Sequence, residues 1–148
     1  MKILGLIPAR SGSKGVKNKN TIIINKKKLI EYTFHAALKS KLLKSIILST
    51  NCKKVIGVKK KFNKIKLLNR PENLSKDNSS VFDVIKHALT NEKENNIIYD
   101  YVVLLQPTTP LKNSKIIDIG IKKIIRENGS SLVSVYEVED NHPARMYK

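Results

Sequence analysis

The stretch Ile3-Leu4-Gly5-Leu6-Ile7-Pro8, followed by the polar segment 9–20, gives the clearest indication of the fold of this 148-residue chain. An apolar run that ends at a proline is typical of a strand buried on both faces. The polar segment contains Gly12 and Gly15. A buried strand that leads into a polar loop with glycines is typical of the first strand of an α/β sheet. We therefore predict a strand over 3–7 and a ligand-facing loop after it.

Strand-like and helix-like segments alternate along the rest of the chain. Apolar runs predict strands over 21–24, 45–49, 65–68, 99–105 and 131–135. Helical spacing of apolar residues predicts helices over 29–41, 53–62, from Ser79 or Ser80 to Asn91, and 114–126. Because strands separated by helices form βαβ crossovers, we predict an α/β fold: a Rossmann-like open, mostly parallel sheet with helices on both faces. No linker or internal repeat divides the sequence.

Three predicted loops follow strands of this sheet. Ligands of open parallel sheets bind beyond the carboxyl ends of the strands, and this rule selects loops 9–20, 69–80 and 106–113. The same loops hold the residues with unusual chemistry. We therefore predict that the three loops form one shared site.

The chain is strongly basic, with 29 Lys and Arg against 12 Asp and Glu and a net charge of +17. Of these cations, 25 are Lys and only 4 are Arg. A nucleic-acid surface often combines Arg with aromatic side chains, whereas aromatic residues make up 5% of this chain and Trp is absent. The lysine excess therefore indicates a solvated surface more than a nucleic-acid footprint, although the charge favours anionic ligands.

Few residues suggest metal or covalent chemistry. Cys52 is the only cysteine, which excludes an intramolecular disulfide and a Cys-rich zinc site. His35 and His87 fall within predicted helices, and no histidine pair has the spacing of metal ligands. No apolar run approaches the roughly 20 residues that span a bilayer, and no secretory signal is evident. We expect a cytoplasmic protein that does not interact with membranes.

The first loop combines glycines with basic residues. Gly12 and Gly15 let backbone N–H groups approach an oxyanion, and Arg10, Lys14 and Lys19 supply positive charge. We predict phosphate binding, with a solvated turn as the alternative. The loop is not a Walker A motif, because its lysine precedes its second glycine. It also matches the GXXG of RNA-binding KH domains, but that motif lies between two helices and a strand precedes it here.

The second and third loops offer polar groups of other kinds. Arg70 is a rare arginine whose planar guanidinium suits a ligand, or it forms a surface ion pair with Glu72. Asp77-Asn78-Ser79-Ser80 supplies a carboxylate and hydroxyls, or only caps a helix. Gln106-Pro107-Thr108-Thr109-Pro110 presents an amide and two hydroxyls at a strand end, or forms a rigid turn.

Five separated blocks together resemble a known family. They are Ile7–Gly15 with Lys19-Asn20, Leu48-Ser49-Thr50, Arg70–Asp77, His87-Ala88-Leu89 and Leu104–Leu111. In this order and spacing, the chain resembles the acylneuraminate cytidylyltransferases, or CMP-sialic acid synthetases, which include enzymes for legionaminic and pseudaminic acid. The Lys19-Asn20 pair favours this group over the related synthetases for the eight-carbon acid Kdo.

The resemblance implies a reaction. CMP moves from CTP to a nine-carbon 2-keto-3-deoxy sugar acid of the sialic, legionaminic or pseudaminic type, pyrophosphate is released, and Mg²⁺ is the cofactor. The anomeric hydroxyl attacks the α-phosphorus, so positioning and charge stabilisation dominate. The resemblance also implies a homodimer in the full-length family and a place in cell-surface glycan biosynthesis.

The resemblance assigns nucleotide contacts to the first loop. Arg10, Ser13 and Lys14 are expected to hold the β- and γ-phosphates. Lys19 is expected on the α-phosphate, where negative charge builds, so Lys19 and Arg10 are the expected catalytic residues. Asn20 is expected to touch the nucleotide.

The resemblance assigns the binding of cytosine, ribose and the sugar acid to the other two loops. By resemblance, Arg70 and the turn from Asp77 to Ser79 enclose cytosine and ribose. Gln106, with Thr108 nearby, is expected to orient the sugar acid.

The chain departs from the family pattern in two places. Asn51 stands where the family usually has an aspartate after Ser-Thr, which removes a carboxylate. The family is also longer, and its last third carries an Asp-x-Asp metal site. We expect residues 1–148 to be the nucleotide-binding cytidylyltransferase domain without that third, because Glu137, Glu139 and Asp140 do not match the metal pattern. Mg²⁺ would then rest mainly on the triphosphate.

Three other function classes remain open. A nucleotidyltransferase for another base or sugar would keep the first loop and lose the Gln106 block. A nucleotide-binding module without turnover would share every motif present. An RNA-binding protein would explain the charge of +17 but not the ordered loop blocks.

Overall fold

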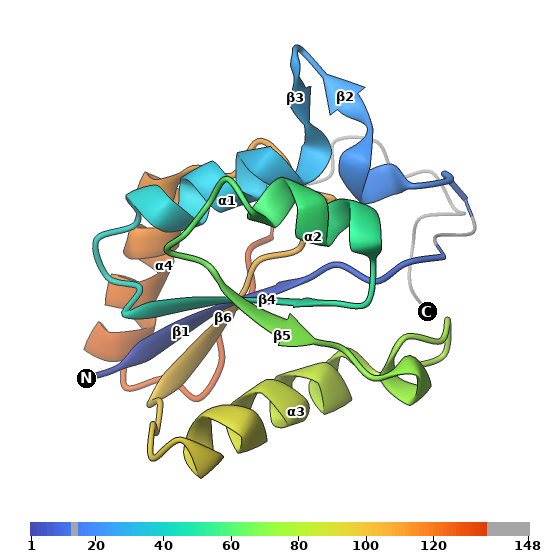
Figure 1. Ribbon diagram of the computed structural model, residues 1–148. Helices are drawn as coiled ribbons and strands as arrows, with labels where there is room; N and C mark the ends of the chain where they lie inside the picture. Colours follow the sequence, from blue (N-terminus) through green and yellow to red (C-terminus); the bar gives the residue numbers. More distant parts are fainter. Residues whose placement is uncertain (13–14, 136–148) are drawn as a thin grey trace, which may run out of the picture.

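The computed structural model describes residues 1–12 and 15–135, which form a parallel four-stranded sheet in the order β5-β4-β1-β6 (Figure 1). The strands are β1 (Ile3–Pro8), β4 (Ser45–Thr50), β5 (Lys66–Asn69) and β6 (Tyr101–Leu104). β1 pairs in parallel with β4 on one side and with β6 on the other. The stretch that most clearly indicates the fold is therefore an inner strand of the sheet.

Burial on both faces explains why β1 is apolar at consecutive positions. Ile3 and Ile7 belong to the larger core cluster, and Leu4 and Leu6 to a second cluster on the opposite face. All four are buried, with at most 3% of their surface exposed. Each such side chain stabilises the fold by about 1.5–3 kcal/mol relative to an exposed one. The prediction of a strand buried on both faces is confirmed.

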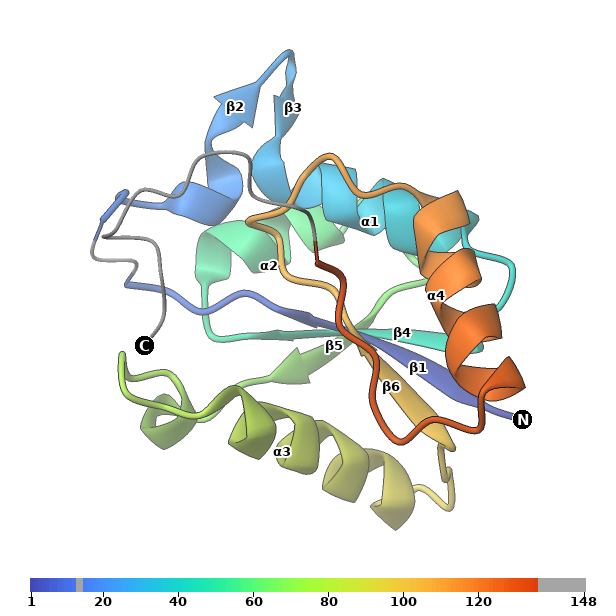
Figure 2. The ribbon, with the colours of Figure 1, turned by 180° about the vertical axis from the view of Figure 1, so that it is seen from behind.

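Helices cover both faces of the sheet, which confirms the predicted fold class. Figures 1 and 2, seen from opposite sides, show α1, α2 and α4 on one face and α3 on the other. Their bounds are α1 Leu29–Lys39, α2 Lys53–Lys59, α3 Val81–Glu94 and α4 Ser114–Arg126. The N-cap of α3 is Ser80, whose hydroxyl accepts a hydrogen bond from the Phe82 amide at 3.1 Å. This contact decides between the two predicted caps.

The predicted helix ends differ from the observed ones by a few residues. The helix predicted over 53–62 ends at Lys59, because the amides of Lys61 and Phe62 turn back to carbonyls three residues earlier. Such tighter bonds often close the last turn of a helix. α1 likewise ends at Lys39, where Ser40 donates to the Ala37 carbonyl at 3.2 Å.

A small antiparallel hairpin, β2 (Ile23–Ile24) and β3 (Lys27–Lys28), projects from the molecule after η1 (Lys19–Thr21). The predicted strand over 21–24 is therefore two residues shorter at its start, because Thr21 belongs to the 3₁₀ turn. Asn25 and Lys26 both have positive φ, at 45° and 67°. Two such residues in succession form the tight turn of a two-residue hairpin.

The strand predicted over 131–135 is wrong. Within the part of the chain that the structure describes, this segment is not a strand, and all five of its residues are exposed. Val133 and Val135 are 78% and 87% exposed. A short apolar run becomes a strand only where a neighbouring strand supplies backbone hydrogen bonds, and the described ladder of β6 joins it to β1.

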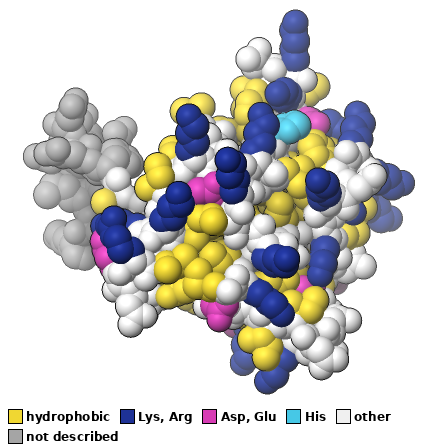
Figure 3. Space-filling view, turned by 90° about the vertical axis from the view of Figure 1, so that its left-hand side faces the viewer, with side chains coloured by type: hydrophobic (Ala, Val, Ile, Leu, Met, Phe, Trp, Pro, Cys, Tyr) yellow, Lys and Arg dark blue, Asp and Glu magenta, His cyan; other side chains and the backbone are white. Residues whose placement is uncertain are grey.

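The lysine-rich surface carries no single basic patch on the face drawn in Figure 3, where Lys and Arg side chains are spread among apolar and neutral ones. This spacing fits the prediction of a solvated surface there. Among residues 1–12 and 15–135, no helix has both the length and the apolar character needed to cross a bilayer.

Candidate functional site

A pocket of about 480 Å³ opens where the three predicted loops meet, beyond the carboxyl ends of β1, β5 and β6. Its walls are formed by Pro8, Arg10, Gly15, Val16, Lys19, Asn20, Arg70, Ser79, Val81, Val84, Gln106, Pro107 and Thr108. The structure thus brings together predicted site residues from all three loops: Arg10, Lys19, Asn20, Arg70, Ser79, Gln106 and Thr108. The carboxyl ends of parallel strands lie at one edge of the sheet, which is why loops far apart in sequence converge.

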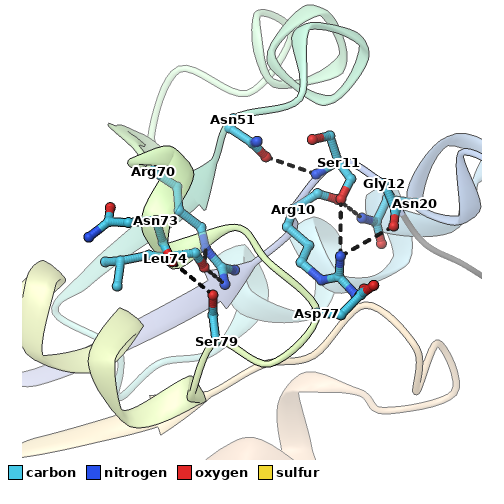
Figure 4. Close-up of polar contacts among 10 residues, drawn as sticks. All are labelled: Arg10, Ser11, Gly12, Asn20, Asn51, Arg70, Asn73, Leu74, Asp77 and Ser79. Carbon is cyan, nitrogen blue, oxygen red and sulfur yellow. Dashed lines mark hydrogen bonds and ion pairs between the residues drawn. The ribbon is translucent and has the colours of Figure 1, made fainter.

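Arg10 links the first loop to the second (Figure 4). Its Nη2 lies 2.6 Å from Oδ1 of Asp77, and its Nη1 donates to the Gly12 carbonyl at 3.2 Å. Gly12 has a φ of +73°, a left-handed conformation that glycine adopts without strain. Asp77 therefore reaches the predicted site through Arg10, although it does not line the pocket wall.

Two asparagines hold the first loop in place. The Oδ1 of Asn51, at the end of β4, accepts a hydrogen bond from the Ser11 amide at 2.8 Å. Asn20, which is 9% exposed, donates from Nδ2 to the Arg10 carbonyl at 3.4 Å. Asn51, the departure from the family pattern, thus keeps an acceptor for the loop while bringing no negative charge to it.

Arg70 lies inside the second loop and is only 8% exposed. Its Nε and Nη2 both donate to the Leu74 carbonyl, at 2.7 Å from Nε. Its burial excludes the alternative of a surface ion pair with Glu72. Burial lowers the pKa of the Arg70 guanidinium, and the positive charge of Arg10 lowers that pKa further. The Ser79 hydroxyl closes the same loop by donating to the Asn73 carbonyl at 3.0 Å.

Lys112, near the end of the third loop, contacts both the loop backbone and α1. The Nζ of Lys112 donates to the carbonyls of Gln106 at 2.6 Å and Thr109 at 2.7 Å, and to Oγ1 of Thr33 in α1 at 3.3 Å. Burial lowers the pKa of Lys112 to about 8. Thr109 also donates its hydroxyl to the Gln106 carbonyl at 3.1 Å.

The pocket is electropositive and suits an anion. Arg10, Lys19 and Arg70 lie on its wall, and Asp77 is the carboxylate that pairs with one of them. Guanidinium groups bind phosphate oxygens through paired hydrogen bonds, and an ammonium acts as a point charge. Over the described ranges, no three His, Cys, Asp or Glu side chains form a group that could hold a metal ion. The described residues therefore do not fit a protein-held Mg²⁺.

Two apolar wall residues were missed as site residues. Val81 and Val84, at the start of α3, are among the lining residues, and Val84 is fully buried beneath the surface. Their helical spacing predicted an inward face but not which end of that face meets a ligand. Lys112 and Asn51 were also missed as loop-holding residues, because Thr33 and Ser11, which they contact, lie far from them in the sequence.

Some residues that the sequence analysis singled out are not among those that the structure describes. Ser13 and Lys14 of the first loop lie outside the described residues, as do Glu137, Glu139 and Asp140. His35 is exposed on α1 and contacts Phe62 edge-on, with ring centroids 5.3 Å apart.

The chain is similar in sequence to several known proteins. A family model described as cytidylyltransferase matches residues 4–144. The N-acylneuraminate cytidylyltransferase of Escherichia coli O18:K1:H7 (strain RS218 / NMEC) is 40% identical over 121 residues, which are 82% of this chain and 28% of that protein. The CMP-N,N'-diacetyllegionaminic acid synthase of Legionella pneumophila is 36% identical, over 91% of this chain and 58% of that protein. The pseudaminic acid cytidylyltransferase of Campylobacter jejuni is 35% identical, over 94% and 60%.

Two solved structures share the fold. CMP:2-keto-3-deoxy-manno-octonic acid synthetase complexed with CTP has a TM-score of 0.68 at 20% identity, covering 86% of this chain and 49% of the other. A cytidylyltransferase from Leptospira borgpetersenii has a TM-score of 0.66 at 24% identity, covering 87% and 51%. The chain therefore spans between about a quarter and three fifths of the length of these proteins.

Proposed function

This chain belongs to the cytidylyltransferase family, and from that premise we propose that its pocket binds CTP and transfers CMP to a nine-carbon 2-keto-3-deoxy sugar acid. The observation that carries the proposal is the convergence of Arg10, Lys19 and Arg70 with the Gln106 amide around one pocket of about 480 Å³. The cations of Arg10 and Lys19 suit a triphosphate, and a neutral amide with Thr108 beside it suits a hydroxylated acid.

The nucleotide contacts follow from the loop geometry and the family resemblance. Arg10, with Ser13 and Lys14, is assigned to the β- and γ-phosphates. When phosphate binds, Arg10 must exchange its 2.6 Å contact with Asp77 for contacts with phosphate oxygens. This exchange breaks the ion pair that joins the first two loops. Lys19 is assigned to the α-phosphate and Asn20, anchored to the Arg10 carbonyl, to the nucleotide.

The base and ribose are assigned to the side of the pocket formed by the second loop and α3. Arg70 holds that loop through the Leu74 carbonyl, and Ser79 holds it through Asn73. With Asp77 in the same turn, these residues would shape an enclosure for cytosine and ribose. Val81, which is half-buried at the start of α3, supplies an apolar surface against which a planar base can pack.

The proposed reaction is an in-line displacement at phosphorus. The anomeric hydroxyl oxygen of the sugar acid forms a bond to the α-phosphorus, its proton passes to solvent water, and the bond from the α-phosphorus to the bridging oxygen breaks to release pyrophosphate. Lys19 would stabilise the negative charge that increases on the α-phosphoryl oxygens during the reaction. Arg10 would stabilise the negative charge on the leaving pyrophosphate. Such preorganised charges supply most of the catalysis in reactions of this kind.

Mg²⁺ remains part of the proposal as a companion of the nucleotide. It would screen the negative charge of the triphosphate, whose oxygens would hold it, since the described side chains form no metal-ligand group. We also propose a cytoplasmic homodimer that acts in cell-surface glycan biosynthesis. Sedimentation velocity on the purified protein tests the dimer.

The test compares nucleotides first and turnover second. Calorimetry with Mg²⁺ should show tighter binding of CTP than of ATP, and addition of N-acetylneuraminic, legionaminic or pseudaminic acid to the CTP complex should release pyrophosphate. Binding of CTP without pyrophosphate release would leave the second candidate, a nucleotide-binding module. Tight RNA binding with no preference among free nucleotides would refute both.

A further inference from the structure

The side chain of Lys112 connects the third loop to the helix behind it. The three oxygens within reach of its Nζ come from two elements: the carbonyls of Gln106 and Thr109, and the hydroxyl of Thr33 in α1. Thr33 is fully buried. An ammonium group has three N–H donors, so these three acceptors use all of them.

The Gln106 carbonyl is the centre of this arrangement. It accepts from Lys112 at 2.6 Å, from the Thr109 hydroxyl at 3.1 Å and from the Thr109 amide at 3.4 Å. The Lys112 contact is the shortest of the three and is assisted by charge, which makes such bonds about twice as strong as neutral ones. On its other side Gln106 follows Leu105, whose amide donates to the Leu6 carbonyl at 2.8 Å.

The rest of the loop has little apolar anchoring. Between Gln106 and Leu111, a range that the structure describes completely, only Pro107 is buried, and Leu111 is 92% exposed. Pro107 and Pro110 have no N–H to donate. The Lys112 contacts are therefore the main polar link between the Gln106 loop, defined as residues 106–111, and the core.

We propose that Lys112 is a positioning residue: it fixes the Gln106 loop against α1 and so sets how well the Gln106 side chain engages the second substrate, a sugar acid. This inference rests on the proposed function. Lys112 does not line the pocket, whereas Gln106 and Thr108 do, so its effect passes through the loop backbone. The charged site for the triphosphate is formed by the other two loops, so CTP binding should not depend on Lys112.

The test uses Lys112→Met, which keeps the length of the side chain and removes the charge and its donors. Lys115→Met is the matched control, since Lys115 is exposed and follows shortly in α4. Amide hydrogen exchange over 106–111 should become at least about tenfold faster in Lys112→Met and stay unchanged in Lys115→Met. Lys112→Arg, which keeps charge and donors, should restore most of the protection.

The functional arm separates the two substrates. In Lys112→Met, kcat/KM for the sugar acid should fall by about 10- to 100-fold, as expected when a reacting group is misplaced by about 1 Å. The Kd of CTP should stay within about twofold. Exchange rates equal to those of the wild type would overturn the proposal, as would faster exchange with an unchanged kcat/KM. A wild-type protein that releases no pyrophosphate would refute the proposed function, and the exchange measurement would still decide whether Lys112 holds the loop.

Discussion

Asp77→Asn tests whether Arg10 must leave a carboxylate in order to bind phosphate. The variant keeps the shape of the side chain and removes the negative charge that lies 2.6 Å from Arg10 Nη2. Arg10 then has no anionic partner to exchange at this position. We therefore expect inorganic triphosphate to bind more tightly to the variant than to the wild type.

The magnitude follows from the geometry and exposure of the pair. Two unit charges centred about 4 Å apart attract by about 1 kcal/mol in water and by about 4 kcal/mol at an effective dielectric constant near 20. The side chains of Arg10 and Asp77 are 28% and 39% exposed, so solvent screening puts this pair near the lower value. A difference of about 1 kcal/mol corresponds to about fivefold in Kd.

Calorimetric titration with inorganic triphosphate, at low and at high ionic strength, measures this difference. Glu94→Gln is the matched control, because Glu94 is exposed at the far end of α3 and its loss changes the net charge equally. The gain of Asp77→Asn should shrink at high salt. Equal Kd values for the two variants would refute the exchange argument, since the gain would then come from net charge. CTP should gain less than triphosphate if Asp77 also contacts the ribose.

Three further predictions concern the lysines and the first loop. Lys19→Ala should lower kcat for pyrophosphate release by about 100-fold if Lys19 stabilises the developing charge, and an unchanged rate would remove it from the mechanism. Lys112 should titrate near pH 8 by ¹³C NMR of its Cε, because burial lowers its pKa from 10.5. Between pH 8 and 10.5 the unfolded chain then binds more protons at Lys112 than the native protein does, so the contribution of Lys112 to the free energy of unfolding rises with pH. Urea unfolding of the wild type and of Lys112→Arg across that pH range checks the sign. If the free energies of unfolding of the two proteins change with pH in parallel, the prediction is contradicted. Asn51→Ala should cost about 1 kcal/mol of unfolding free energy by removing the 2.8 Å contact to the Ser11 amide. Asn51→Asp keeps that acceptor and should weaken triphosphate binding while unfolding near the wild-type denaturant concentration; equal affinity would show that no phosphate lies near residue 51.

The order of strands and helices could be predicted because it depends on local patterns. The apolar run from Ile3 to Ile7 needs burial on both faces, and only an inner strand of a covered sheet supplies that burial. The segment 131–135 has a similar apolar pattern and is exposed. The difference lies in the neighbours available for pairing, which no local pattern encodes.

The three loops that form the pocket could be identified from the amino-acid sequence, since residue types and strand ends are both local features. The sequence also placed Arg10, Arg70 and Gln106 on those loops. The contacts that hold these side chains depend on the folded chain: Arg10 contacts Asp77, 67 residues away, and Lys112 contacts Thr33, 79 residues away. Hydrogen bonds and ion pairs act over a few ångströms, so such partners are defined only when the sheet has brought the loops together.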